Sequence, residues 1–319
     1  WGEEVTITDA NLILGVLHPD KFLGGKMKLN RPKAERLLEE KIARPLGLSL
    51  LEAADGILKI INAKMEEAIK AVSSQRGYDI RDFTLVAFGG GGPMHAGRIA
   101  LDLGIPSLLI PFAPGVTSAL GLLMSDVKHD YVRSKLAPLK EVGLEEGNRL
   151  FSQLIEQAKT DLRSEGFNDN EMALQPFLDL RYAGQGYELT VPSPMPPLKA
   201  ADLDLMRQRF DSQHEQAHGH KAESEPVELV SLRLVSVGLV PQAKLSPVKS
   251  RGKELDAAKT GERKIFFGKE HGSLNCRIYS RDLLEPDHKI AGPAVIEQMD
   301  TTTVIHPEQE AVVDSYRNL

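Results

Sequence analysis

The sequence predicts a mixed α/β protein whose first part, residues 1–134, differs in pattern from the rest of the chain. Two short apolar runs of strand length, 83–88 and 107–110, are separated by a segment with a helix pattern. A crossover of this kind joins two parallel strands. Further along, apolar and polar residues alternate at every second position, as in strands with one buried face. The two patterns together predict an α/β part followed by an α+β part.

The first part is expected to contain two helices before its strands. A short helix at 30–44 is predicted because Asn30 can cap its N-terminus and Pro32 is tolerated in the first turn. A long amphipathic helix then runs from Ser49 to near Gly77, since apolar residues recur at steps of three and four. The residues of this apolar stripe are Leu51, Ala54, Leu58, Ile61, Met65, Ile69 and Val72. Two shorter helices are expected at 96–103 and 117–125.

The rest of the chain is predicted to hold two further domains. The middle one, 135–245, combines a helix that stops at Gly166, a hairpin, a helix at 202–218 and a long strand at 227–240. The inward-facing set of that strand shifts from Val230, Leu232 and Leu234 to Val235, Val237 and Leu239, which predicts a bulge between Leu234 and Val235. A polar linker at 241–262 precedes the β-rich domain, 246–319. Its strands are expected at 264–267, 277–284, 294–305 and 311–316, and those of the hairpin at 178–182 and 187–191.

Composition narrows the class of protein. Apolar residues make up 41% and charged residues 26%, the balance of a folded globular chain, and the net charge is −6. The basic residues form no long run, so we expect neither a nucleic-acid partner nor a membrane partner. The lone cysteine, Cys276, excludes an internal disulfide framework and is expected to be a small buried side chain. With no signal-peptide pattern, a cytoplasmic location is expected. Because the chain opens on Trp1, it is expected to be a piece of a longer polypeptide.

A run of four glycines, Gly89–Gly92, is the most informative motif. It lies between a buried strand and a helix, where a bare backbone and free helix N–H groups suit a nucleotide. The dinucleotide fingerprint fits poorly, since no acidic residue stands about 20 positions further on. A phosphate P-loop is absent, because Gly25-Lys26 is followed by Met27. The alternative is that the glycines only let the helix pack tightly on the strand.

Two further groups are candidates for a site. His95 follows the glycines closely enough to contact a ligand, although a single histidine at a helix start is more often structural. The segment Asp300–Thr303 is expected in a strand and could line a pocket, but threonine also favours strands for packing reasons. No G-x-S-x-G nucleophile motif occurs in the sequence, and no catalytic residue is assigned.

Several motifs, taken together and in order, resemble those of the hydantoinase A/5-oxoprolinase family, which also includes subunits of acetone and acetophenone carboxylases. The resemblance covers essentially the whole chain. Each motif is weak by itself, and the order and spacing make the resemblance specific. The motifs are TITDANLILG at 6–15, FLGG at 22–25, RGYD at 76–79, LVAFGGGGPMHA at 85–96, PGVTSALG at 114–121, RYAGQGY at 181–187 and GPAVIEQMDTTT at 292–303.

This resemblance implies a part of an actin-like ATPase domain, residues 1–134, followed by an α+β segment and a small β-rich C-terminal unit. It assigns the adenosine side of an ATP site to Gly89, Gly90, Gly91, Gly92 and Pro93, with His95 beside them. The glycine-rich phosphate loops of the family do not occur in these 319 residues. The ligands of Mg²⁺ are therefore expected outside this chain.

The resemblance also implies an activity. It predicts the C-terminal fragment of an ATP-dependent hydrolase of small cyclic amides, in which phosphorylation activates the ring carbonyl. A hydantoinase B-type partner subunit or fused domain completes the reaction, and an oligomer is expected. The fragment is expected to be inactive alone. Two alternatives stay open at this point: a subunit of an ATP-dependent ketone carboxylase, and a non-catalytic module that docks a partner subunit.

Overall fold

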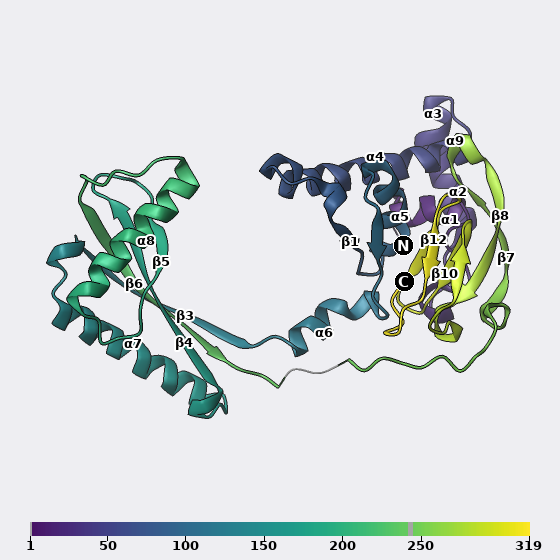
Figure 1. The fold of residues 1–319 in the computed structure, drawn as a ribbon. Helices are drawn as coiled ribbons and strands as arrows, with labels where there is room; N and C mark the ends of the chain where they lie inside the picture. The colour runs from purple at the N-terminus through teal and green to yellow at the C-terminus, as the bar shows by residue number, and fades with distance from the viewer. Residues whose placement is uncertain (1, 242–244) are drawn as a thin grey trace. The chain divides into compact units, whose positions relative to one another are not determined.

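The computed structural model describes residues 2–241 and 245–319 (Figure 1). Contacts divide the chain into two compact units. Unit 1 is discontinuous and consists of Trp1–Leu123 and Lys244–Leu319, whereas unit 2 is the continuous segment Met124–Ala243. The expected division into 1–134, 135–245 and 246–319 stays a prediction, because contacts do not measure whether a segment folds by itself.

The first helices of unit 1 begin where their caps predict. Asn30 caps α2 (Arg31–Leu38), and its side chain accepts a hydrogen bond from the Lys33 N–H. Ser49 caps the long helix α4 (Leu50–Val72) in a reciprocal capping box with Glu52. The helix expected at 30–44 is interrupted, since α2 continues as a π-helix (Glu39–Ala43) before a short α3 (Arg44–Leu46). Ahead of them lies α1 (Ile7–Ile13).

The predicted crossover is confirmed. Strands β1 (Thr84–Val86) and β2 (Ser107–Leu109) pair in parallel, and α5 (Gly92–Leu103) connects them. Helix α6 (Thr117–Leu123) follows β2 after a short turn. The glycine run therefore occupies the junction between β1 and α5, at the carboxyl end of a parallel strand.

The C-terminal part of unit 1 is a four-stranded sheet in the order β11-β10-β8-β7, with a second pair, β9 and β12, beside it. The single strand expected at 294–305 is wrong: it is two antiparallel strands joined by a turn in which the Gln298 N–H bonds the Thr301 carbonyl. The bounds are β7 (Lys259–Phe266), β8 (Ser273–Ser280), β9 (Lys289–Ala291), β10 (Ala294–Glu297), β11 (Thr302–Ile305) and β12 (Glu310–Val312).

The N-terminal and C-terminal segments of unit 1 contribute side chains to the same buried clusters. Leu12 and Leu38 of the N-terminal helices lie in one buried cluster with Ile278 of the C-terminal sheet, and a second cluster joins Ala96 of α5 to Ile296. The backbones of Ile110 and Leu319 also exchange two hydrogen bonds of 2.8 and 2.9 Å. The glycine junction is consequently supported by segments that lie about 200 residues away in the sequence.

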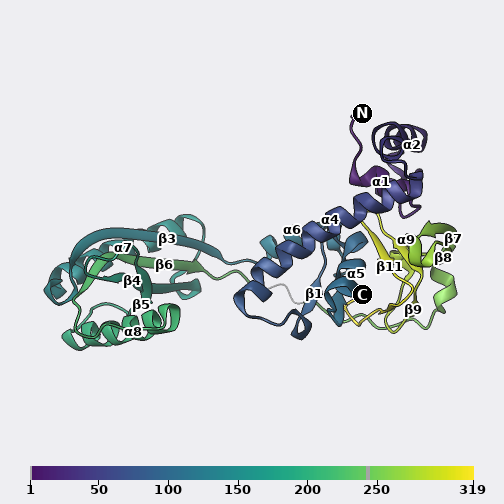
Figure 2. The same ribbon diagram turned by 90° about the horizontal axis from the view of Figure 1, so that it is seen from above.

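Unit 2 is an antiparallel sheet in the order β3-β6-β4-β5, which shares one core with helices α7 and α8 (Figure 2). The predicted hairpin is confirmed as the pair β4–β5. Strand β6 contains a bulge, but it lies at Val230, which the pairing skips opposite the step from Asp179 to Leu180, and not between Leu234 and Val235, where it was predicted. Strand β3 was not expected, because this edge strand has few buried residues. The bounds are β3 (Val127–Pro138), α7 (Leu144–Ser164), β4 (Met172–Tyr182), β5 (Leu189–Pro192), α8 (Ala200–His218) and β6 (Val227–Gly238).

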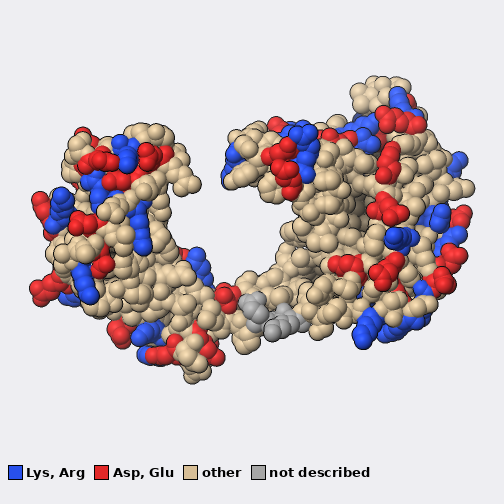
Figure 3. Space-filling view, in the orientation of Figure 1, with Lys and Arg blue, Asp and Glu red and all other residues tan. Residues whose placement is uncertain are grey.

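The expected linker at 241–262 falls partly outside the described residues, which omit 242–244. Its later portion is structured, since a 3₁₀ turn (Leu255–Ala258) leads into β7. On the face shown in Figure 3, acidic and basic side chains are interspersed over each unit. Of the helices in the described residues, none combines the length and the apolar character needed to cross a bilayer.

Candidate functional site

The glycine run forms a tight turn whose backbone is fixed from two sides. Gly89 has a φ of +82°, a left-handed conformation that favours glycine, and its N–H donates to the Pro114 carbonyl at 2.7 Å. Gly91 caps α5 and Pro93 lies in the first turn of that helix. A helix start leaves its first N–H groups without partners inside the helix, so this turn presents backbone donors.

The turn between β10 and β11 holds the glycine turn in place. The Thr301 hydroxyl donates to the Gly90 carbonyl at 2.9 Å, and the Gly115 N–H donates to the Asp300 carboxylate at 2.9 Å. A Cβ on Gly115 would overlap that carboxylate, so only glycine fits there. The three segments, which carry the motifs GGGGPMH, PGVTSALG and EQMDTTT, thus meet at one place.

A cavity of about 270 Å³ opens beside this junction, and we call it the glycine-turn cavity. Gly90 and Gly91 line one side, and the turn around Asp300 lines another. Lys21 closes a third side and pairs with Glu297 at 3.2 Å. The cavity is lined by Thr8, Leu17, His18, Lys21, Phe22, Leu23, Gly90, Gly91, Met94 and Glu297–Thr302. Five of the motifs noted in the sequence therefore contribute to its walls or to the turns that support them.

The predicted site residues do not all reach this cavity. Gly90 and Gly91 line it, Gly89 shapes the turn, and Gly92 and Pro93 begin the helix. His95 lies elsewhere: it is only 7% exposed, and its Nδ1 lies 2.9 Å from the Asn62 Oδ1 on α4. Burial lowers the pKa of His95, so its ring is neutral at neutral pH. The nucleotide-binding role of these six residues stays a prediction.

His95 and Asn62 line a second cavity of about 390 Å³, which we call the His95 cavity. It lies between α4, α5 and residues 265–270, with Val304 and His306 on the last side. Burial, followed by the nearby Arg98 charge, lowers the pKa of His306 to about 4. Sequence reasoning missed Asn62, although an amide beside the apolar stripe of α4 was an available signal. Among the described residues, no three metal-ligating side chains are grouped to hold an ion.

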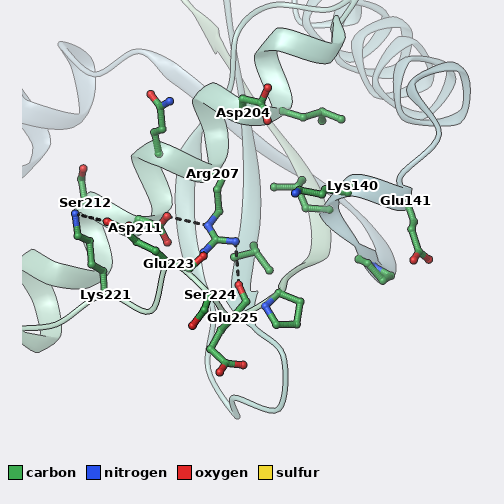
Figure 4. Close-up of a pocket in the computed structure, with 16 residues that line it drawn as sticks. Lys140, Glu141, Asp204, Arg207, Asp211, Ser212, Lys221, Glu223, Ser224 and Glu225 are labelled. Carbon is green, nitrogen blue, oxygen red and sulfur yellow. Dashed lines mark hydrogen bonds and ion pairs between the residues drawn. The ribbon is translucent and has the colours of Figure 1, made fainter.

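The cavity in unit 2 is larger, about 710 Å³, and is shown in Figure 4. Arg207 lies across it and bonds the Asp211 carboxylate at 2.8 Å. The same guanidinium donates to the carbonyls of Ala222, Glu223 and Glu225 at 2.9–3.1 Å. The Nε of this side chain therefore bonds within α8, and its two terminal nitrogens fasten the loop 222–225 to that helix, which is a structural task.

Comparison with protein families shows to which family this chain belongs. A profile described as hydantoinase/oxoprolinase matches residues 1–131, and one described as the hydantoinase/oxoprolinase C-terminal domain matches residues 140–319. The chain belongs to the hydantoinase/oxoprolinase family. This confirms the resemblance found in the sequence.

Curated relatives of this family member include several named enzymes. It is 39% identical over 316 residues to an uncharacterized protein of Methanocaldococcus jannaschii, covering 98% of this chain and 44% of that protein. It is 34% identical to the caprolactamase subunit alpha of Pseudomonas jessenii (98% and 45%) and 33% identical to the acetophenone carboxylase gamma subunit of Aromatoleum aromaticum (99% and 44%). The chain thus spans about half the length of the curated relatives it matches.

Solved structures share the fold. The nucleotide-free structure of acetone carboxylase, from work on ATP-dependent acetone carboxylation, matches with a TM-score of 0.84 at 27% identity, covering 98% of this chain and 46% of that one. The ATP-dependent caprolactamase from Pseudomonas jessenii matches with a TM-score of 0.77 at 34% identity (99% and 46%). The predicted α/β fold class is confirmed by these likenesses.

Proposed function

We propose that this chain is the C-terminal part of an ATP-dependent hydrolase subunit for small cyclic amides, of the hydantoinase/5-oxoprolinase type. The observation that supports it most is the glycine-turn cavity, where motifs from four distant segments meet at the N-terminus of α5. Named relatives with this fold are ATP-dependent. Of the two solved structures described above, the one with the higher identity, 34%, is a caprolactamase by name.

The residues of the cavity fit a nucleotide. A Cβ at Gly91 would meet only the Met94 methyl group, at 3.9 Å, and glycine lets the backbone approach a ligand without a side chain between them. The start of α5 offers N–H donors and the positive end of a helix dipole to an anionic or polar group. The Thr301 and Asp300 contacts hold the turn rigid, which lowers the entropy that binding would otherwise cost. The ligands of Mg²⁺ lie, in this proposal, outside the 319 residues.

Bound ATP supplies the phosphoryl group that the reaction needs. An amide carbonyl is a poor electrophile because the nitrogen lone pair is delocalised into it, and phosphorylating its oxygen creates a good leaving group. This chain contributes positioning: the glycine turn orients the nucleotide and the surrounding walls exclude water. A partner subunit or fused domain then completes ring opening, and we propose a cytoplasmic oligomer.

Calorimetry on the full-length protein that contains this chain tests the nucleotide site. The variant Gly91→Val adds a branched side chain at a residue that lines the cavity, and its Cβ would meet no atom closer than the Met94 methyl group at 3.9 Å. We expect it to fold normally and to lose ATP binding by about a hundredfold or more, the effect of blocking a preformed pocket. The matched control is Gly56→Ala on α4, which also points into open space and lies outside the cavity. Unchanged ATP binding by Gly91→Val contradicts the proposal.

The second candidate is a ketone carboxylase subunit, favoured by the higher TM-score of the acetone carboxylase match. ATP turnover separates the two. A hydrolase consumes ATP with hydantoin or 5-oxoproline and without bicarbonate, whereas a carboxylase requires both a ketone and bicarbonate. If the full-length protein binds no nucleotide at all, the remaining alternative, a docking module for a partner subunit, gains support.

A further inference from the structure

The glycine turn is held by a short stretch of chain, 110–115, which follows β2 and leads toward α6. The Gly89 N–H donates to the Pro114 carbonyl at 2.7 Å, and the Gly115 N–H donates to the Asp300 carboxylate. Because Gly89 has a left-handed backbone and no side chain to hold it, its geometry depends on the position of that carbonyl. Whatever fixes the stretch 110–115 therefore also fixes the glycine turn.

Phe112 is a residue at which the C-terminal part of the chain holds this stretch. Its N–H donates to the Asn318 Oδ1 at 3.1 Å, and its carbonyl accepts from the Gln298 Nε2 at 3.1 Å. Phe112 is 36% exposed, so packing holds it less firmly than it holds a core residue. These two side-chain amides consequently bear on the position of Pro114, which lies two residues further along the chain.

The Asn318 amide is oriented by the groups on both of its sides. Its Nδ2 donates to the Asp314 Oδ2 at 2.9 Å, and its Oδ1 accepts from Phe112. A carboxylate only accepts hydrogen bonds and a backbone N–H only donates them, so the reversed amide would lose both bonds. The Asp314 carboxylate is itself fixed, because its Oδ1 accepts from the N–H groups of Tyr316 and Asn318 at 2.8 and 2.7 Å.

The C-terminal turn 314–318 closes without the Asn318 amide. The Arg317 N–H donates to the Asp314 carbonyl at 2.9 Å, and the Asp314 N–H donates to the Asn318 carbonyl at 3.0 Å. The amide is therefore available for a contact outside the turn, and it makes that contact with Phe112, 206 positions away in the sequence. We propose that Asn318 is a positioning residue for the glycine turn, on which it acts through Phe112 and Pro114.

This proposal rests on the proposed function for the identity of the ligand, ATP, whereas the effect on the turn itself is independent of it. Hydrogen exchange on the full-length protein without nucleotide measures that effect in peptides that cover 86–92. In Asn318→Ala, we expect the Gly89 amide to exchange about tenfold faster, the factor expected when one hydrogen bond of the supporting segment is lost. The control is Ser315→Ala, at an exposed residue of the same turn, which should exchange as the wild type does. Unchanged exchange in Asn318→Ala overturns the proposal.

Exchanging the amide and the carboxylate tests the orientation of Asn318. Asn318→Asp places two carboxylates side by side and should speed exchange at the glycine turn, because the Asp314 carboxylate loses its donor. The double variant Asp314→Asn/Asn318→Asp restores a donor at 314 and an acceptor at 318, so exchange should return to within about twofold of the wild-type rate. This pair also decides the matter if Asn318→Ala fails to fold. A double variant that exchanges as fast as Asn318→Asp overturns the proposal.

ATP affinity, measured at a temperature where each variant is fully folded, separates positioning from a contribution to stability alone. Asn318→Ala should bind ATP about tenfold more weakly, with recovery in the double variant, because a looser turn must be ordered on binding. A purely structural role would lower the melting temperature and leave ATP affinity unchanged, and that result overturns the proposal. If the wild type binds no ATP, the proposed function fails, and the exchange rates alone decide the role of Asn318.

Discussion

The cavity of unit 2 is almost twice the volume of the His95 cavity in unit 1, yet its central polar group is fully used by the protein itself. Arg207 bonds one carboxylate and three backbone carbonyls around the unit 2 cavity. In the His95 cavity, a buried histidine and a buried amide that line the space bond each other, and no other hydrogen bond of their side chains is found among the described residues. The hydrogen-bond partners of the lining residues therefore distinguish these two cavities better than their volumes do.

The largest effect on stability is expected for Gly115→Ala in unit 1. The added methyl group would overlap the Asp300 carboxylate and break the bond from the Gly115 N–H, so we expect a loss of about 3 kcal/mol or more in the stability of unit 1. Scanning calorimetry should show one transition lowered by several degrees. Gly56→Ala, with open space at its Cβ in α4, should instead be neutral or stabilise by up to about 1 kcal/mol. If both variants behave alike, the close approach at Asp300 is not what fixes the turn.

Removing the guanidinium of unit 2 should have the next largest effect. Arg207→Ala leaves Asp211 and three loop carbonyls without their partner, and we expect unit 2 to lose about 2–3 kcal/mol of stability. ATP and lactam binding should not change. Arg207→Lys keeps the charge but not the planar fork, so it should recover only part of the loss. Altered ligand affinity in Arg207→Ala would break the distinction between the two cavities.

A pH titration addresses His306, a half-buried histidine that lines the His95 cavity. His306 has a folded pKa of about 4, against an ordinary value of 6.5. Above pH 6.5 both states are neutral there; as the pH falls, the unfolded chain takes up the proton first and unit 1 loses stability. Between pH 7 and pH 4.5 this group should account for about 2 kcal/mol. His306→Gln should lose less stability over that range by calorimetry, and an identical decline in both proteins would contradict the assignment.

The smallest effect is expected for the chemical reactivity of the Cys276 thiol. Its side chain is fully buried in unit 1, and burial raises the pKa of the thiol to about 11. At pH 8 only about one thiol in a thousand is ionised, so alkylation of the native protein should be negligible. Mass spectrometry after iodoacetamide treatment measures it, with a urea-unfolded sample as the positive control. Rapid labelling of the native protein would show that the core around β8 opens readily.

Short-range sequence patterns were sufficient to predict much of the secondary structure of unit 1. The caps at Asn30 and Ser49 act within one helical turn, and the β1–α5–β2 crossover follows from adjacent runs of apolar residues. The hairpin of unit 2 follows from alternation in the same way, whereas the bulge of β6 lies at Val230 and not where the alternation placed it. Strand β3 was not predicted, because it is an edge strand whose side chains are exposed or only half-buried, so its apolar pattern is weak.

The site was harder to predict than the fold. The glycine run was recognised from sequence, but the contact of Asp300 with Gly115 joins residues 185 positions apart and carries no local signal. The turn in which Asp300 lies was not predicted, because residues 294–305 were expected to form a single strand. His95 was expected to face a ligand beside the glycines, whereas the packing of α5 on α4 directs it toward Asn62. Only the tertiary arrangement decides which face of a helix borders which cavity.

The discontinuity of unit 1 also has a consequence for biosynthesis. Unit 2 is continuous, so all of its strands have been translated before residues 245–319 are added. The turn that carries Asp300 and Thr301, and the backbone bonds between Ile110 and Leu319, come from this last stretch. Domains fold as units once their residues are available. The nascent chain therefore holds every strand of unit 2 at a stage when the glycine turn still lacks the residues that hold it in place.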